Sequence, residues 1–156
     1  MGKYASQTSV STEASRSEIE RTLKRYGADQ FLYGWQEESA VVGFRMSGRQ
    51  IKFVLAMPNR NDRIFTHSSK GPRAAHIVEA AWEQACRQRW RALALVIKAK
   101  LEAVEAGISI FEDEFLAHTV LPGGQTVGDW MRPQVDEAIR IGAMPLLLPL
   151  LEAPKP

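Results

Sequence analysis

The middle of the chain carries an excess of basic side chains whose chemistry suits phosphate groups. Residues 49–100 contain eleven basic and three acidic residues, a net charge of +8. Guanidinium and ammonium groups bind phosphate oxygens, and an aromatic ring among them can stack on a base. The predicted nucleic-acid-binding set has ten members: Arg49, Lys52, Arg60, Arg63, Lys70, Arg73, Arg87, Trp90, Arg91 and Lys98.

Three members of this set recur at helical spacing. Arg87, Arg91 and Lys98 lie within about 40° of one another around a helix, because successive residues are about 100° apart. A stripe of this kind indicates a phosphate-binding helix face. The alternative interpretation is a solvated face on which Glu83 pairs with Arg87 and Glu102 pairs with Lys98.

Four further members lie in the polar segment 59–73, which precedes this helix. Its Asn, Ser and Thr side chains are typical donors to phosphate oxygens. Phe65 in this segment and Trp90 in the helix are the aromatic candidates for base stacking, and Ile64 is a further exposed apolar residue. Together with Arg49 and Lys52, three successive elements would carry one sign of charge, as in a nucleic-acid-binding groove. The alternative is an ordinary flexible polar loop.

Residues for catalysis or metal binding do not converge in the sequence. The single cysteine, Cys86, excludes an internal disulfide framework and a multi-cysteine zinc site. Glu114 and His118 would share a helix face, but two ligands make a weak metal site. No phosphate-binding loop, dinucleotide fingerprint or nucleophile elbow is present. We therefore expect no catalytic residue, no metal and no cofactor.

The elements that position the basic residues begin with a short helix near the N-terminus. Residues 1–14 are small and polar and are predicted to form a flexible tail. Ser15 or Ser17 can cap the first helix, since each has a glutamate three residues later. Ile19, Leu23 and Tyr26 then form one apolar stripe. A helix of about 10 residues is marginal in water and must pack on another element.

Three β-prone segments follow this helix. Segments 30–36, 40–46 and 49–57 alternate apolar and polar residues or are rich in aromatic and branched side chains. Ser47-Gly48 is a tight-turn dipeptide between the second and third segments. The pattern predicts an antiparallel three-stranded meander that ends at Pro58.

A long helix over about 74–106 and a C-terminal helical region, 107–156, complete the predicted fold. The long helix would reach about 50 Å, more than a small sheet can cover, so part of it must project or pack elsewhere. We expect Ser109 to cap the next helix, a short helix over 133–141, and a Pro- and Leu-rich strap over 144–151. Residues 15–156 are therefore predicted to form a single α+β domain.

Charge and hydropathy along the chain indicate the class of partner. Residues 101–156 carry three basic and nine acidic residues, a net charge of −6, and we expect this acidic third to recruit a partner protein or to limit non-specific binding. The long helix and the strap offer more apolar surface than one sheet hides, which favours a homo-oligomer. No apolar run is long enough to span a membrane, and residues 1–18 lack the apolar core of a secretory signal, so we expect a cytoplasmic protein with no membrane partner.

Three segments carry a resemblance to a family of small proteins encoded by bacteriophages, prophages and plasmids. They are QRWRALALVIKAKLEAVEAGIS (88–109), FEDEFLAH (111–118) and LPGGQTVGDWMRPQ (121–134), and the first helix and the WQ…VVGFRM hairpin are similar too. The family has no established activity. The resemblance implies a mobile-element setting in a bacterial cell.

The predicted order of elements is also similar to that of two nucleic-acid-binding folds. Three strands before a long basic helix resemble phage single-strand annealing proteins of the Rad52 type, which bind DNA between sheet and helix and act as rings. The order α-β-β-β-α resembles double-stranded-RNA-binding domains, in which the start of the last helix contacts phosphates, as SKGPRAA (69–75) would here. We therefore expect a non-enzymatic nucleic-acid-binding protein, with DNA favoured, that binds or anneals single strands. The alternative is a phage-encoded adaptor or inhibitor of a host factor.

Overall fold

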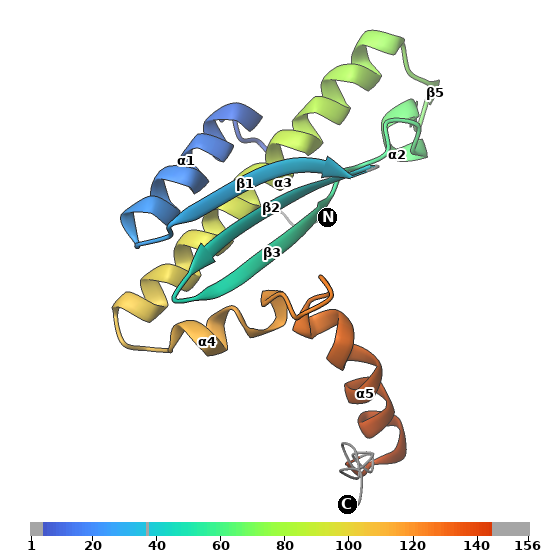
Figure 1. The fold of residues 1–156 in the computed structure, drawn as a ribbon. Coiled ribbons are helices and arrows are strands. Elements are labelled where there is room, and N and C mark those ends of the chain that lie inside the picture. The colour runs from blue at the N-terminus through green and yellow to red at the C-terminus, as the bar shows by residue number, and fades with distance from the viewer. Residues whose placement is uncertain (1–4, 37, 145–156) are drawn as a thin grey trace, which may run out of the picture.

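A three-stranded sheet and one long helix form the centre of the computed structural model, which describes residues 5–36 and 38–144 (Figure 1). This α+β order of helix, meander, long helix and short C-terminal helices confirms the predicted fold class. The elements in chain order are α1 (Thr12–Arg25), β1 (Gln30–Gln36), β2 (Ser39–Met46), β3 (Arg49–Ala56), α2 (Arg63–Thr66), β4 (His67–Ser68), β5 (Gly71–Pro72), α3 (Ala75–Glu105), α4 (Phe111–Glu114), the 3-10 helix η1 (Leu116–His118) and α5 (Val127–Ile141).

The sheet is the predicted antiparallel meander in the order β1-β2-β3. Its tighter turn is closed by Ser47 and Gly48, whose φ angles are 53° and 71°. Two successive positive φ values are what a two-residue hairpin turn requires, and glycine accepts one of them without strain. The turn fixes Met46 opposite Arg49 and so sets the register of the whole second hairpin.

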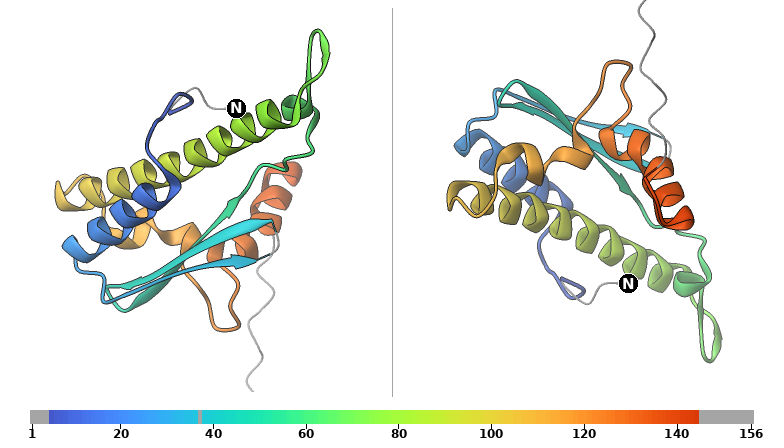
Figure 2. Two further views of the ribbon diagram at one scale, coloured as in Figure 1. Left: turned by 90° about the horizontal axis from the view of Figure 1, so that it is seen from above. Right: turned by 90° about the horizontal axis from the view of Figure 1, so that it is seen from below.

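One face of the sheet packs against α1 and α3, which lie side by side (Figure 2). Alternate residues of the strands point into this layer, and Val42, Phe44, Ile51 and Phe53 are buried there, as the period-2 pattern predicted. The opposite face is solvated, and its Val54 is exposed. The core is therefore a single layer of side chains between the sheet and two helices. It is closed at one end by Phe111 and Phe115, from α4 and the residue after it.

The first helix begins earlier than predicted. Ser11, rather than Ser15 or Ser17, is the N-cap, and its Oγ accepts a hydrogen bond from the backbone N–H of Ala14 at 3.1 Å. Ser15 is instead buried against the rest of the fold. Residues 12–14 of the predicted tail are therefore helical. The backbone carbonyls of Ser6 and Thr8 accept hydrogen bonds from Gln84 of α3.

The long helix is confirmed as α3, and its N-terminal part extends beyond the sheet (Figure 2). The predicted loop over 59–73 is not without regular structure, because it forms α2 and the small β4–β5 hairpin. Phe65 of α2 is buried against Val78 and Ala85 of α3, in a second apolar cluster separate from the main core. Phe65 was predicted to be exposed, and this prediction is wrong, because the projecting part of α3 needs an apolar cover of its own.

The C-terminal elements differ from the prediction at both helix starts. The helix α4 has Ile110 as its N-cap, without a side-chain hydrogen bond, rather than Ser109. The helix α5 begins at Val127, where Thr126 accepts a hydrogen bond from the N–H of Asp129, so Pro133 lies inside the helix rather than at its start. Its end at Gly142, which has a φ of 69°, agrees with the prediction. All of the predicted strap except residue 144 lies outside the described residues.

Candidate nucleic-acid interface

Three of the predicted residues, Arg63, Lys70 and Arg73, lie together on the segment formed by α2 and the β4–β5 hairpin. We call this segment the basic end. It projects past the sheet beside the start of α3 (Figure 1). Arg63 and Lys70 are exposed and Arg73 is half-buried. Within the described part of the chain, none of the three side chains has an ion pair or a hydrogen bond, so their charges are available to a ligand.

Local contacts hold the basic end in shape. Phe65 anchors α2 on α3, and the backbone N–H of Arg73 donates to the carbonyl of Thr66 at 2.8 Å. At the hairpin turn, Ser68 Oγ accepts from the N–H of Lys70 at 3.2 Å, and Gly71 takes a φ of 116° that favours glycine. The basic side chains therefore stand on a short but hydrogen-bonded scaffold.

Arg60 lies beside the basic end but is neutralised. Its guanidinium lies 2.5 Å from the carboxylate of Glu79 on α3. This pair connects the segment before α2 to the long helix. Its contribution to phosphate binding is small unless the pair breaks, because the carboxylate offsets the charge of the guanidinium.

Arg49 and Lys52 lie far from the basic end. Arg49 pairs with Glu112 of α4 at 3.6 Å, and Lys52 donates to the backbone carbonyl of Gly124 at 2.9 Å. α4 follows the C-terminal end of α3, whereas the basic end adjoins its N-terminal end, and the 31 residues of α3 span about 46 Å. The predicted nucleic-acid-binding set therefore combines residues from two separate surfaces of the folded protein.

The basic stripe on α3 is partly used by the fold. Arg87 donates to Gln84 at 3.1 Å, and Arg91 pairs with Glu18 of α1. Lys98 is exposed. The expected helical pairs Glu83–Arg87 and Lys98–Glu102 are not formed in the described structure, because Arg87 turns to an amide and Glu102 accepts from the hydroxyl of Tyr26.

Trp90 is a core residue and not a base-stacking side chain. Only 1% of it is exposed, and its ring meets that of Tyr33 edge to face at 5.5 Å. The guanidinium of Arg16 lies 4.4 Å from the Tyr33 ring and 5.9 Å from the Trp90 ring. The prediction that Trp90 stacks on bases is wrong, because α1 and β1 cover the indole.

Glu114 and His118 do not form a shared site. Glu114 pairs with Lys100 at 3.3 Å, and His118 stacks on Phe53 with ring centroids 3.9 Å apart. Among residues 5–36 and 38–144, no three His, Cys, Asp or Glu side chains are placed to hold a metal ion. Cys86 is half-buried, and burial raises the pKa of its thiol, so the thiol is protonated near neutral pH.

The burial of His118 predicts a pH dependence of stability. Burial lowers the pKa of His118 in the folded protein. A hydrogen bond with the backbone of Lys52 opposes this shift, the charge of Lys100 assists it and the charge of Asp129 opposes it. The unfolded chain then binds the proton more readily, so stability is lost as pH falls below the unfolded value of about 6.5. We expect the melting temperature of the native protein to fall between pH 7.5 and 5.5 by more than that of His118→Gln. His76→Gln, a change at an exposed position on α3, is the matched control and should keep the native slope. Equal slopes for native protein and His118→Gln would contradict this assignment.

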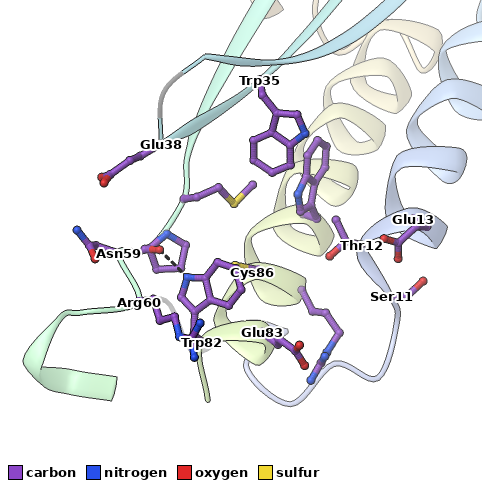
Figure 3. Close-up of a pocket in the computed structure, with 14 residues that line it drawn as sticks. Ser11, Thr12, Glu13, Trp35, Glu38, Asn59, Arg60, Trp82, Glu83 and Cys86 are labelled. Atoms are coloured by element: carbon purple, nitrogen blue, oxygen red, sulfur yellow. Dashed lines mark hydrogen bonds between the residues drawn. The ribbon is translucent and has the colours of Figure 1, made fainter. Parts of the chain in front are cut away.

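Two tryptophans outside the predicted set lie in a cleft between the end of the sheet and α3. Trp35 comes from β1 and Trp82 from α3 (Figure 3). Trp35 is 62% exposed although it is large and apolar. The sequence does not show that three of the four tryptophans line one cleft. Trp35 on β1 is about 50 residues away from Trp82 and Trp90 on α3, and only the fold brings them together.

The described part of the chain contains no helix with the length and apolar character to cross a membrane. Comparisons with protein-family models, curated proteins and solved structures find no match for this chain. The resemblance to proteins of phages, prophages and plasmids stays a prediction.

Proposed function

We propose that this is a non-enzymatic nucleic-acid-binding protein of phage or mobile-element DNA metabolism, which binds or anneals single-stranded DNA. The observation that carries the proposal is the basic end, where Arg63, Lys70 and Arg73 are unpaired within the described structure on a projecting hairpin and helix. Asn, Ser and Thr side chains on and just before these elements add hydrogen-bond donors for phosphate oxygens. Arg49, Lys52, Arg60 and Arg91 each have a partner within the chain, so we leave them out of the proposed interface.

Three phosphate contacts set the salt dependence that the proposal requires. The logarithm of affinity falls with the logarithm of salt concentration with a slope of about −2 for three contacts to single strands and about −2.7 for duplex DNA. Binding should therefore weaken about 20- to 40-fold between 50 and 200 mM salt. Fluorescence anisotropy with labelled single- and double-stranded DNA and RNA measures this directly. No binding at 50 mM salt, or binding that ignores salt, would remove the proposal.

A protein–protein adaptor or inhibitor is the second candidate, and α5 favours it. None of the residues Val127–Ile141 is buried, although the helix is amphipathic. Val135 and Ile139 are exposed and line a shallow groove of about 460 Å³ along this helix. Exposed apolar surface of this kind marks interfaces. A second copy of the chain and a host or phage protein drawn to the acidic last third are the candidate partners.

The adaptor candidate predicts a change of assembly state when α5 is made polar. If a second copy binds there, light scattering at micromolar concentration should show an oligomer for the native protein and a monomer for Val135→Asp/Ile139→Asp. Circular dichroism should show that the variant monomer stays folded, because neither residue is buried within the chain. Val96→Asp, at an exposed position on α3, is the control. A native monomer would leave only a different protein as the partner of α5.

A further inference from the structure

The tryptophan-lined cleft has the dimensions of a ligand site. Its volume is about 670 Å³, and it lies between β1, the segment after β3, α3 and the start of α1. Trp35, Trp82 and Trp90 line it together with Met57 and Pro58 (Figure 3). Pockets of about 300–1,000 Å³ with aromatic walls and a few polar groups are typical of small-molecule sites.

Two of the three indole rings of the cleft, those of Trp82 and Trp90, are held in place before any ligand binds. The indole Nε1 of Trp82 donates to the backbone carbonyl of Pro58 at 2.7 Å, so the ring of Trp82 has one orientation. Trp35 meets Tyr33 edge to face, with ring centroids 5.9 Å apart. Trp90 is held in the core, and its Nε1 is buried without a hydrogen-bond partner in the described structure. A ligand therefore meets preformed rings and needs little ordering of side chains.

The charges around the cleft favour a cation. Glu38 and Glu83 both line it and have no ion-pair partner among the described residues, although Figure 3 shows Glu38 at the rim with its carboxylate directed away from the tryptophan rings. Of the two arginines that line it, Arg60 is paired with Glu79, whereas Arg87 donates to the neutral amide of Gln84 and keeps its charge. A third lining carboxylate, Glu13, lies 3.8 Å from Arg16. Glu38 and Glu83 therefore face one uncompensated guanidinium and leave the cleft with a small negative excess. Unpaired carboxylates beside aromatic faces repel phosphate and attract positive charge.

The same aromatic wall already holds one cation of the protein itself. The guanidinium of Arg16 lies over Tyr33 and Trp90. No lysine or arginine of the described chain lies over the rings of Trp35 or Trp82, which are the two rings nearer solvent. These two faces are therefore free to take a cation from outside.

We propose that this cleft binds an organic cation, an alkylated ammonium group on a short apolar body. The ammonium group lies against Trp35 and Trp82, and Glu38 and Glu83 balance its charge. The ligand reaches the site either as a free small molecule or as the side chain of a trimethyl-lysine in a peptide. The cleft borders the basic end through Arg60 but contains none of Arg63, Lys70 and Arg73. A test with choline therefore does not depend on nucleic-acid binding.

Tryptophan fluorescence tests the site with a pair of probes of equal shape. Trp130→Phe removes the one tryptophan outside the cleft, so the remaining emission comes from Trp35, Trp82 and Trp90. We expect choline to change this emission saturably. Its neutral isostere 3,3-dimethylbutanol should bind about 3- to 30-fold more weakly, which is the effect of a cation–π contact. Equal binding of the two probes, or no saturable change with choline, would overturn the proposal.

Variants in the same background locate the binding. Trp35→Ala and the double variant Glu38→Gln/Glu83→Gln should each weaken choline binding several-fold, and all three positions are solvent-exposed, so folding is preserved. Glu20→Gln removes an exposed carboxylate of α1 outside the cleft and should bind as the parent does. If Glu20→Gln weakens choline binding as much as the double variant, the cleft is not the site. Free trimethyl-lysine and a peptide that contains it distinguish the two sources: tighter binding of the peptide indicates a peptide ligand, and equal binding indicates a free small molecule.

The thiol of Cys86 gives a second readout, because it lines the cleft and is the one cysteine of the chain. Saturating choline should slow its alkylation by a maleimide, whereas 3,3-dimethylbutanol at the same concentration should slow it less. Alkylation that is equally fast with and without choline would contradict binding at this position.

Discussion

Replacement of Trp90 by alanine is expected to lower the free energy of unfolding by about 3–5 kcal/mol. The indole is 1% exposed and packs against Tyr33 and beneath Arg16, so its loss leaves a large cavity in the main core. Urea denaturation measures the change. Trp130→Ala, at a position that is 51% exposed on α5, is the matched control and should change the free energy by less than about 1 kcal/mol.

The same experiment distinguishes a core role of Trp90 from the base-stacking role that the sequence suggested. If Trp90 stacked on bases, Trp90→Ala would keep its stability and lose affinity for nucleic acid. Trp90→Phe keeps an aromatic ring in the core and should recover much of the lost stability. A stable Trp90→Ala with weakened nucleic-acid binding would show that the indole leaves the core when the ligand binds.

Reversing the charge of Arg63, Lys70 and Arg73 together to glutamate should remove nucleic-acid binding, with a loss of at least about 100-fold at 50 mM salt. All three phosphate contacts disappear and three repulsive charges replace them. The fold should survive, because none of these side chains is buried or paired in the described structure. Anisotropy titrations and a melting curve measure both effects.

A matched control carries the same change of net charge at the other end of the molecule. Arg21, Lys24 and Arg25 are exposed on the last turns of α1, and their reversal to glutamate should leave most of the affinity intact. If both triple variants lose binding equally, only the total charge matters and the basic end is not the interface. Arg87 and Arg91 are poor positions for this test, although their stripe suggested it. Arg91 pairs with Glu18, so Arg91→Glu would place two carboxylates together and destabilise the contact between α1 and α3.

The strands were predictable because local rules decide them. The alternation of apolar residues in 40–46 and 49–55 matches the buried and exposed faces of β2 and β3, and Ser47-Gly48 supplies the turn that aligns them. The burial of Ile19 and Leu23 follows in the same way from their helical spacing. Both predictions use only the periodicity of side chains within one segment.

Helix starts were harder to predict, because the cap in the structure is not the one with the stronger sequence pattern. Ser15 and Ser17 each have a glutamate three residues later, whereas Ser11, the observed N-cap, has Ala14 there, and Ser15 is buried in the fold. In α5, Thr126 begins the helix and overrides the usual preference of Pro133 for the first position. The choice in each case depends on tertiary contacts that local patterns do not contain.

The candidate interface was predicted only in part, because charge along the sequence does not show which charges are paired in space. Arg91 and Glu18 are 73 residues apart, and Arg49 and Glu112 are 63 apart, so neither ion pair has a sequence signature. The three residues of the basic end were identifiable because they are close in sequence and share one hairpin and its neighbouring helix. The tryptophan cleft was not identifiable, since its walls come from four separate segments.

The two apolar clusters on one helix have a consequence for how the protein opens. The cluster that anchors the basic end has three buried residues, Phe65, Val78 and Ala85, whereas the main core has fifteen. Small clusters lose their packing at a lower free energy than large ones, so such segments open as sub-global units. We therefore expect α2 and the β4–β5 hairpin to open more readily than the sheet and the main core, with faster amide hydrogen exchange in residues 63–72. The basic end is thus a surface that can reshape itself on a ligand without unfolding the domain.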